Sequence, residues 1–483
     1  MPQSCSDVAI IGGGAAGASV FGQLLDHACP GAVHWIVDRP WPGRGLAYST
    51  TDDRHLLNVR AGGMGLFAGQ LDSFLHYVGE RVADAKDTDF LPRRLFGEFI
   101  EAQLRERMKA AQQRGRRFSV HVSAAQRVER QGNGYLIRLA NGHVLRADAV
   151  TLALGAVAPR PLKAASSSAR ASGAYELDPW SLSHRQQAPE RLLVIGTGLT
   201  MVDVLLSAAT RWPETKLIAV SRHGRLPLVH SELPSPPYAS QRELNSALQA
   251  CTRILPMLRL FRAALRDVAP GEWHALMEGI RPIDATLWQL LPLHEQRRFL
   301  RHMRWIWEAA RHRIAPASHA ALQSLMESGR LEIRAARVLK VEGEGPLALT
   351  VRDRRTQAIE TLQADLVVQA TGLDTAVAYA DHPLLSQMQQ DGLIAPDPLQ
   401  LGLAARPDGR LLNARDEVQP GLYAVGSLLK GSLWECTAMP EIRNAAHELV
   451  ATLMQGHPLA TDDAPEGLTT TPLRAVRSTA GFG

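Results

Sequence analysis

The sequence predicts an α/β protein built from two similar strand–turn–helix units, with a block of helices inserted into the second. A glycine-rich turn at residues 12–17 follows a short apolar strand and opens an apolar helix, and a similar turn recurs at 196–201. Between about 226 and 330 the pattern changes to a Leu-, Arg- and Trp-rich helical periodicity. The chain of 483 residues is too long for one hydrophobic core, so two or three domains are expected.

The first unit carries the pattern G-x-G-x-x-G at residues 12–17, directly after the strand 7–11. The first glycine makes a tight turn, the second lets the backbone approach a pyrophosphate, and the third lets helix and strand pack closely. Asp38 ends the next strand, 26 positions after Gly12, where a carboxylate can accept hydrogen bonds from a ribose. This unit is therefore predicted to be a Rossmann-like dinucleotide-binding domain. The expected cofactor contacts are Gly12, Gly14, Ala15, Ala16, Gly17, Asp38 and Arg39.

The second unit repeats the pattern as GTGLTM, with Met201 in the place of the third glycine, which predicts looser packing of helix on strand. Arg222 stands 26 positions after Gly196, in the register of Asp38. A guanidinium there pairs with a 2′-phosphate, so the second site is expected to prefer NADPH to NADH. Alternatively, Arg222 and Arg225 are surface cations on a vestigial fold. The expected contacts are Gly196, Gly198, Leu199, Thr200, Ser221, Arg222 and Arg225.

The duplication extends to two segments, 147–155 and 364–372, which match in their Ala-Asp, Val, Ala and Gly positions at a constant offset of 217. In the first unit the pair Asn141-Gly142 predicts a hairpin, so a β-meander is expected before the matched strand. The glycines that end the two segments are expected to mark crossings between the domains. The predicted division is 1–170 for the first domain, 171–355 for the second with its insertion, 356–461 for the return to the first domain, and 462–483 for a tail.

Composition excludes several classes of protein. The chain is 45% hydrophobic and 21% charged, with no apolar stretch of about 18 residues and no secretion signal, so we expect a cytoplasmic globular protein without a membrane partner. The net charge of +5 comes from arginines spread along helices, which suggests a surface for anionic small molecules or a merely solvated surface, and not a nucleic-acid site. The four cysteines stand far apart, so neither a dithiol centre nor a metal site is expected. The candidates for an acidic substrate, or else for an exposed helix face, are Arg298, Arg301, Arg304 and Arg311.

Residues 421–427, GLYAVGS, resemble the strand–Gly–Asp segment that closes the FAD site in glutathione-reductase-like flavoproteins, with Ser427 in the place of the usual Asp. Residues 43–66 and 92–99, together with both glycine turns, resemble a group of bacterial FAD/NAD(P)-binding proteins related to the flavin N-hydroxylating monooxygenases. The resemblance covers most of the chain apart from the insertion and the tail. It implies FAD in the first domain and a nicotinamide cofactor in the second.

The resemblance also implies which residues surround the flavin. Thr437 and Ala438 open the last helix, whose dipole would stabilise negative charge at the flavin pyrimidine edge. A hydroxyl at Ser427 can still bond a ribityl or phosphate oxygen, without the charge of Asp. The further contacts implied are Arg44, Leu46, Ala47, Leu57, Asn58, Val128, Gly155, Gly372 and Gly426.

Five residues are implied in the reaction itself. Asn58 would hydrogen-bond the intermediate or NADP⁺, and Arg93 or Arg94 would hold a substrate carboxylate. Trp434 and Glu435 would flank the flavin ring, with plain core packing an equal alternative for Trp434.

Electrons passed from NADPH to FAD need an acceptor, and the sequence lacks a cysteine pair and the ligand patterns of haem and iron–sulfur groups. We therefore expect molecular oxygen as the acceptor, with a flavin hydroperoxide that hydroxylates a small amine or amino-acid-like substrate. Baeyer–Villiger or sulfur monooxygenation and NADPH-dependent flavin reduction are alternatives. A non-catalytic flavin-binding sensor or assembly protein is the alternative of another class, and a homo-oligomer stays open.

Overall fold

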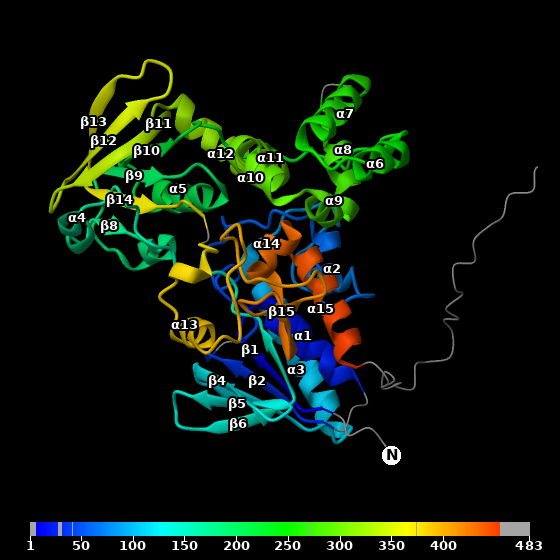
Figure 1. Ribbon diagram of the computed structural model, residues 1–483. Helices are drawn as coiled ribbons and strands as arrows, with labels where there is room; N and C mark the ends of the chain where they lie inside the picture. Colours follow the sequence, from blue (N-terminus) through cyan, green and yellow to red (C-terminus); the bar gives the residue numbers. More distant parts are fainter. Residues whose placement is uncertain (1–5, 28–30, 41, 270, 373, 455–483) are drawn as a thin grey trace, which may run out of the picture.

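The computed structural model describes residues 6–27, 31–40, 42–269, 271–372 and 374–454. Cys5, Cys29 and the tail expected at 462–483 lie outside these residues. Figure 1 shows the second large sheet at the upper left, the first below it, and the helices of the insertion at the upper right. The architecture confirms an α/β protein with two Rossmann-like domains, β-meanders and a helical insertion.

The first sheet has the strand order β15-β16-β7-β1-β2-β3, and all of its strands except β15 pair in parallel. Every residue of β1 (Val8–Ile11) and β7 (Ala149–Leu152) is buried, as expected for parallel strands covered on both faces. β16 (Val418–Ala424) pairs with β7, so the chain returns late in the sequence to complete this sheet. The other strands are β2 (Val33–Val37), β3 (Phe118–Val122) and β15 (Arg410–Leu412).

Helices cover one face of this sheet and a β-meander covers the other. Because side chains alternate along a strand, Val8 and Ile10 pack toward the helices, whereas Ala9 and Ile11 pack toward the meander. The turn between β5 and β6 contains Asn141-Gly142, as predicted. The helices are α1 (Ala15–Asp26), α2 (Ser73–Gly79), α3 (Arg93–Gln113) and α15 (Met439–Leu453). The other face carries β4 (Ala125–Gln131), β5 (Gly134–Leu139), β6 (Val144–Ala147) and α13 (Pro383–Gln390).

The second sheet repeats this plan in the order β13-β12-β11-β10-β9-β14-β8. Its β11 (Leu331–Glu342) pairs in parallel with β10 over its first half and antiparallel with β12 over its second half, so one long strand belongs to both the sheet and its meander. Helix α5 (Leu199–Arg211) follows the glycine turn and packs on the core strands. The other strands are β8 (Tyr175–Glu176), β9 (Arg191–Ile195), β10 (Lys216–Ser221), β12 (Leu347–Asp353), β13 (Ile359–Ala364) and β14 (Leu366–Gln369).

Two of the predicted domain boundaries need correction. The boundary at 355 is too early, because β13 and β14 belong to the second sheet and the chain returns to the first domain only after Gln369. The boundary at 170 is too late, because Ala165 and α4 (Ser167–Ala171) pack in the core of the second domain. The matched segments contain strands of different sheets, β7 in the first and β14 in the second, so their similarity does not place both in the first domain.

The insertion between β10 and β11 consists of helices within the range expected from the periodicity. Its last helix, α12 (Pro316–Glu327), packs on α5, while the preceding helices form a separate core. In the part of the chain that the structure describes, no helix is long and apolar enough to cross a membrane. The helices of the separate core are α6 (Gln241–Gln249), α7 (Ile254–Asp267), α8 (Trp273–Ile280), α9 (Asp284–Leu290), α10 (Leu293–His302) and α11 (Arg304–Arg311).

Candidate cofactor and substrate site

The first glycine turn leaves no room for side chains at two of its positions. Gly12 has φ +129°, and a Cβ there would lie 2.2 Å from the carbonyl oxygen of Ala153. A Cβ at Gly17 would lie 2.2 Å from the carbonyl oxygen of Gly12. The indole Nε1 of Trp35 donates to that same oxygen at 2.9 Å and fixes the turn from the neighbouring strand. The turn is therefore held tightly against β7 and β2, as the glycine pattern predicts.

Both glycine turns end in a helix without a side-chain cap. Gly14 and Gly198 are the N-caps of α1 and α5, each in an extended conformation. The first-turn N–H groups of Ala15 and Ala16, and of Leu199 and Thr200, are therefore not satisfied by a capping side chain. Such a helix start suits a pyrophosphate.

The end segment of the chain lies against the first turn. A Cβ on Gly426, whose φ is +80°, would lie 3.4 Å from Cβ of Ala16. The next residue, Ser427, is 7% exposed, and its hydroxyl has no hydrogen-bond partner among the described residues. A buried hydroxyl without a partner is unusual in a folded chain, and here it stands beside a turn built for phosphates. Thr437 and Ala438 directly precede α15, as predicted.

The loop after β2 contacts the glycine turn but uses its arginine elsewhere. The N–H of Gly43 donates to the carbonyl of Gly13 at 2.8 Å. Arg44 donates twice to the carboxylate of Glu101 on α3, at 2.6 and 3.0 Å, so its guanidinium serves the protein itself. The side chains of Leu46 and Ala47 are exposed and are not engaged in this way within the protein. Asp38 is likewise exposed beyond β2, 4.0 Å from Arg39, with its carboxylate open to a ribose.

Asn58 lies where the insertion meets this loop. Leu57 beside it is buried in the first core, and the carbonyl of Asn58 accepts a hydrogen bond from Nε2 of His230 at 3.1 Å. Burial and then Arg313 lower the pKa of His230 to about 3, so the ring is neutral and carries its proton on Nε2. The side-chain amide of Asn58 has no partner among the described residues. It therefore stays available to a ligand.

The roles predicted for Arg93 and Arg94 need correction. Arg93 donates to Asp203 on α5 at 2.6 Å and to the carbonyl of Leu56 at 3.0 Å, and both side chains of the ion pair are largely buried. Arg94 binds Asp53 at 2.5 Å and Glu98 at 3.1 Å. Arg93 has one carboxylate partner and Arg94 has two, so a substrate carboxylate would compete with these ion pairs.

A second polar network beside this pair joins the same two domains. His55 lies between Thr50 and Ser207, at 2.7 Å from Nδ1 and 2.8 Å from Nε2, and Ser207 of α5 donates to Asp52 at 2.6 Å. Sequence reasoning missed Ser207 and Asp203, because nothing local marks a helix residue as the partner of a loop more than 100 residues away.

Trp434 and Glu435 face the insertion. Trp434 stacks on Trp288 at a centroid distance of 5.0 Å and belongs to the core of the insertion, which favours the packing alternative. Glu435 accepts from Nε1 of Trp307 at 2.6 Å, and Nε2 of His312 lies 3.5 Å away. Burial alone would raise the pKa of Glu435, but His312, Arg311 and Trp307 together lower it to about 2. Glu435 is therefore ionised at neutral pH, and it contacts side chains of the insertion.

Val128 also differs from expectation. Gln387 of α13 accepts from its N–H and donates to its carbonyl, both at 2.9 Å, so the two backbone groups of this buried residue are occupied. The crossing glycines Gly155 and Gly372 have φ of +68° and +89°, and a Cβ on either would meet nothing within 4 Å. The space over these glycines thus stays open, whereas Val128 offers no free backbone group to a cofactor.

The second glycine turn resembles the first in its tightness. A Cβ on Gly196, with φ +123°, would lie 2.1 Å from the carbonyl oxygen of Ala370. Met201 is fully buried in the core between α5 and the sheet, so its side chain fills the space and the expected loose packing is not seen. Thr197 donates to the carbonyl of Arg225 at 2.7 Å and contacts Ser221 at 2.9 Å, which folds the loop after β10 onto this turn.

A cluster of cations lies on that loop. Arg222 and Arg225 are exposed, and Arg354 from the β12–β13 turn donates to the carbonyl of Arg222 at 3.1 Å. Trp305 of α11 stacks on His223 at 4.2 Å, and the guanidinium of Arg225 lies 5.3 Å from its ring. Three guanidinium groups therefore gather where the 2′-phosphate was expected. Sequence reasoning missed Arg354 because it stands 132 positions after Arg222.

The four arginines singled out in the insertion do not form one site. Arg298 pairs with Glu295, Arg304 pairs with Glu308, and the buried Arg311 pairs with Glu441 on α15. Arg298 and Arg301 both line a hollow on the surface of α10, which Arg304 and Arg311 do not.

Comparison with known proteins agrees with this geometry. Residues 9–157 match a family model described as FAD-NAD(P)-binding, and comparison with curated protein sequences finds no significant match. An ornithine N-hydroxylase of Kutzneria sp. 744, whose structure is described with reduced FAD, NADP⁺ and L-ornithine, has a TM-score of 0.64 at 15% identity, over 94% of this chain and 99% of that one. L-lysine 6-monooxygenase from Pseudomonas syringae has a TM-score of 0.63 at 16% identity, over 93% and 99% of the two chains. The FAD-bound cadaverine monooxygenase from Erwinia amylovora has a TM-score of 0.60 at 13% identity, over 97% and 99%.

The chain has the fold of the two-domain flavoproteins. At these identities the likeness to solved structures shows the fold alone, and it includes the region of the helical insertion, since it spans nearly all of each chain. The first domain of this flavoprotein fold is the FAD-NAD(P)-binding domain, with the glycine turn at its start and the C-terminal segment that holds Ser427 against it.

Two cysteines lie among the described residues, and they stand in different parts of the fold. Cys436 is buried in the core of the first domain, and burial raises the pKa of its thiol to about 12. Cys251 lies on the insertion, and both thiols are free. A thiol with such a high pKa is a poor nucleophile.

Proposed function

We propose that this chain is an FAD-dependent, NADPH-using monooxygenase that hydroxylates the nitrogen of a small amine or amino-acid-like substrate. The observation that carries the proposal is the pair of uncapped, glycine-tight helix starts on two sheets that buried polar contacts hold together. The likeness over nearly the whole chain to three amine hydroxylases supports the nitrogen substrate.

The residues present fit both cofactors. For FAD, the glycine turn leaves the helix start open to the pyrophosphate, Asp38 offers a carboxylate to the ribose, and the unpartnered hydroxyl of Ser427 offers a hydrogen bond. For NADPH, Arg222, Arg225 and Arg354 supply the positive charge that a 2′-phosphate requires. When bound, FAD would carry electrons from NADPH to molecular oxygen.

The chain itself would orient the substrate and exclude water. The amide of Asn58 is free to donate to or accept from a ligand. Glu435 is permanently ionised, and its oxygens are taken by Trp307 and His312. A neutral amine needs no strong protein base to act as a nucleophile, which is consistent with this arrangement.

The described residues favour a substrate without a carboxylate. Arg93 and Arg94 are paired within the protein, so a simple amine or diamine fits the described residues better than an amino acid held by these arginines. The ornithine and lysine enzymes share the fold with an enzyme for cadaverine, a diamine without a carboxylate.

The test is turnover with a panel of amines. The purified, FAD-loaded chain is incubated with NADPH, oxygen and either diamines or the matching amino acids, while NADPH oxidation, hydrogen peroxide release and hydroxylamine product are measured together. We expect NADPH oxidation that one amine accelerates, with a hydroxylamine formed in proportion. NADPH oxidation that yields only hydrogen peroxide with every amine would reject the monooxygenase, and no flavin reduction under anaerobic NADPH would reject the oxidoreductase as a whole.

A further inference from the structure

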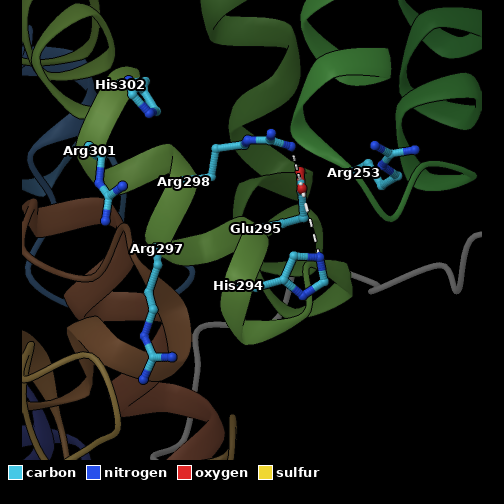
Figure 2. Close-up of a pocket in the computed structure, with 7 residues that line it drawn as sticks. All are labelled: Arg253, His294, Glu295, Arg297, Arg298, Arg301 and His302. Atoms are coloured by element: carbon cyan, nitrogen blue, oxygen red, sulfur yellow. Dashed lines mark hydrogen bonds and ion pairs between the residues drawn. The ribbon is translucent and has the colours of Figure 1, made fainter.

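A cationic hollow lies on the surface of the insertion, outside the candidate cofactor site. It has a volume of about 650 Å³ and lies over α10 and the residue before α7. Figure 2 shows Arg253 across from Arg298, with Glu295 between them, whereas Arg297 and Arg301 extend from the other side of α10. Its lining residues are Arg253, His294, Glu295, Arg297, Arg298, Arg301 and His302.

Glu295, the only acidic group of this lining, already has hydrogen-bond partners. One oxygen of Glu295 accepts from the N–H of Ile254 at 2.8 Å, at the start of α7, and the other accepts from Arg298 at 2.8 Å. The backbone N–H of Ile254, followed by Arg298, lowers the pKa of Glu295, so it stays ionised and neutralises Arg298. Glu295 therefore leaves the remaining cations of the hollow without a counter-charge.

Three guanidinium groups of the lining have no ion pair among the described residues: those of Arg253, Arg297 and Arg301. Arg297 and Arg301 stand four positions apart on α10, where side chains are neighbours on the helix surface, so one anion can reach both guanidinium groups. Guanidinium forks match phosphate oxygens in geometry, and one phosphate group carries more charge than a carboxylate. Every residue of the lining carries a charged or imidazole side chain, so the hollow suits a polar ligand better than an apolar one.

We propose that this hollow binds a compact polyphosphate anion, either inorganic pyrophosphate or the phosphate chain of a nucleotide. Its volume falls within the range of about 300–1,000 Å³ that small-molecule sites have. The site is separate from the proposed catalytic reaction, and it does not depend on the flavin or on the 2′-phosphate cluster at Arg222.

The test is calorimetric titration of the FAD-loaded chain with pyrophosphate, ATP and inorganic monophosphate, in saturating NADP⁺ and in an Arg222→Ala background, so that the second dinucleotide site contributes nothing. We expect one saturable site for pyrophosphate and ATP, weaker binding of monophosphate, and a loss of affinity as salt is raised. Tighter binding of ATP than of pyrophosphate would identify a nucleotide as the ligand, and equal affinity would identify the phosphate chain alone.

A matched pair of double variants separates the hollow from general surface charge. Arg297→Ala with Arg301→Ala removes two lining cations, and Arg259→Ala with Arg262→Ala removes two exposed arginines of α7 that do not line it. We expect the first pair to weaken pyrophosphate binding at least tenfold and the second to leave it within about twofold, with both variants folded by thermal melting. Equal losses in the two variants, or no saturable binding to the parent chain, would overturn the proposal.

Discussion

Arg93, the first residue of α3, donates a 2.6 Å hydrogen bond to Asp203 of α5 and so joins the two dinucleotide folds by a buried ion pair. Burial raises the pKa of Asp203, and the Arg93 charge opposes that effect. The pair lies next to the segment 43–66, because Arg93 also donates to the carbonyl of Leu56. The relative position of the two cofactor turns thus depends on a contact that no single domain contains.

Arg93→Ala should destabilise the protein by about 3–5 kcal/mol, because it leaves the Asp203 carboxylate buried without its partner. The free energy of unfolding in urea measures this loss. Arg94→Ala is the matched control, since its pairs with Asp53 and Glu98 are more exposed and should contribute at most about 1 kcal/mol. Similar losses for the two variants would contradict a special role for the buried pair.

Ser427→Ala should weaken FAD binding by about fivefold to tenfold, the value of one hydrogen bond of about 1 kcal/mol. The flavin-free protein should keep its stability, because the hydroxyl has no partner among the described residues. Titration of the apoprotein with FAD, followed by flavin fluorescence, measures the affinity, and Ser427→Thr keeps the hydroxyl as a control. Unchanged affinity in Ser427→Ala would show that the flavin does not contact this residue.

Arg222→Ala and Arg354→Ala should each raise the KM for NADPH by tenfold or more while leaving the KM for NADH nearly unchanged, since a charged hydrogen bond contributes about 1.5–3 kcal/mol. Arg352→Ala removes an exposed arginine from the neighbouring β12 and serves as the control. Equal effects on the two cofactors would mean that these cations do not recognise the 2′-phosphate and that the second fold is vestigial in this respect.

Asn58→Ala should increase the hydrogen peroxide released per NADPH oxidised, because a bound ligand would lose the hydrogen bond that the free side-chain amide of Asn58 offers. Peroxide and hydroxylated product are measured in the same reaction. His230→Gln is a useful companion, since its side-chain amide can still donate to the carbonyl of Asn58. A product-to-peroxide ratio identical to that of the parent enzyme would remove Asn58 from the reaction.

Asp284 should make stability depend on pH. Burial, followed by Glu435, raises its pKa to about 7, and one of its carboxylate oxygens has no partner among the described residues. The folded state therefore holds this proton more tightly than the unfolded state, and its contribution to stability falls as the pH rises from about 4 to about 7.

Asp284→Asn removes that penalty. Relative to the parent chain, the variant should be more stable at pH 8 than at pH 5 by about 1–3 kcal/mol. Urea unfolding at the two pH values measures the difference, and Asp267→Asn on the exposed end of α7 should show none. The same stability difference at both pH values would mean that Asp284 keeps an ordinary pKa.

The features of this protein that could be predicted from its sequence follow local rules. Glycine is required at positions 12 and 196 because the backbone there turns with positive φ against a neighbouring strand. The two turns could therefore be predicted from spacing and context. The helical insertion could be predicted from periodicity, and the β5–β6 hairpin from Asn141-Gly142. Each of these rules acts between residues close together in the chain.

Which polar groups are free and which are paired follows from contacts between distant parts of the chain. Arg93 and Val128 were assigned to ligands, yet Asp203 lies 110 positions from the first and Gln387 lies 259 positions from the second. In the same way, Arg354 on a distant turn donates to the carbonyl of Arg222 in the loop after β10. The physical reason is that a buried charge or amide must find a partner in space, and the sequence does not record which surfaces meet when the two sheets and the insertion pack together.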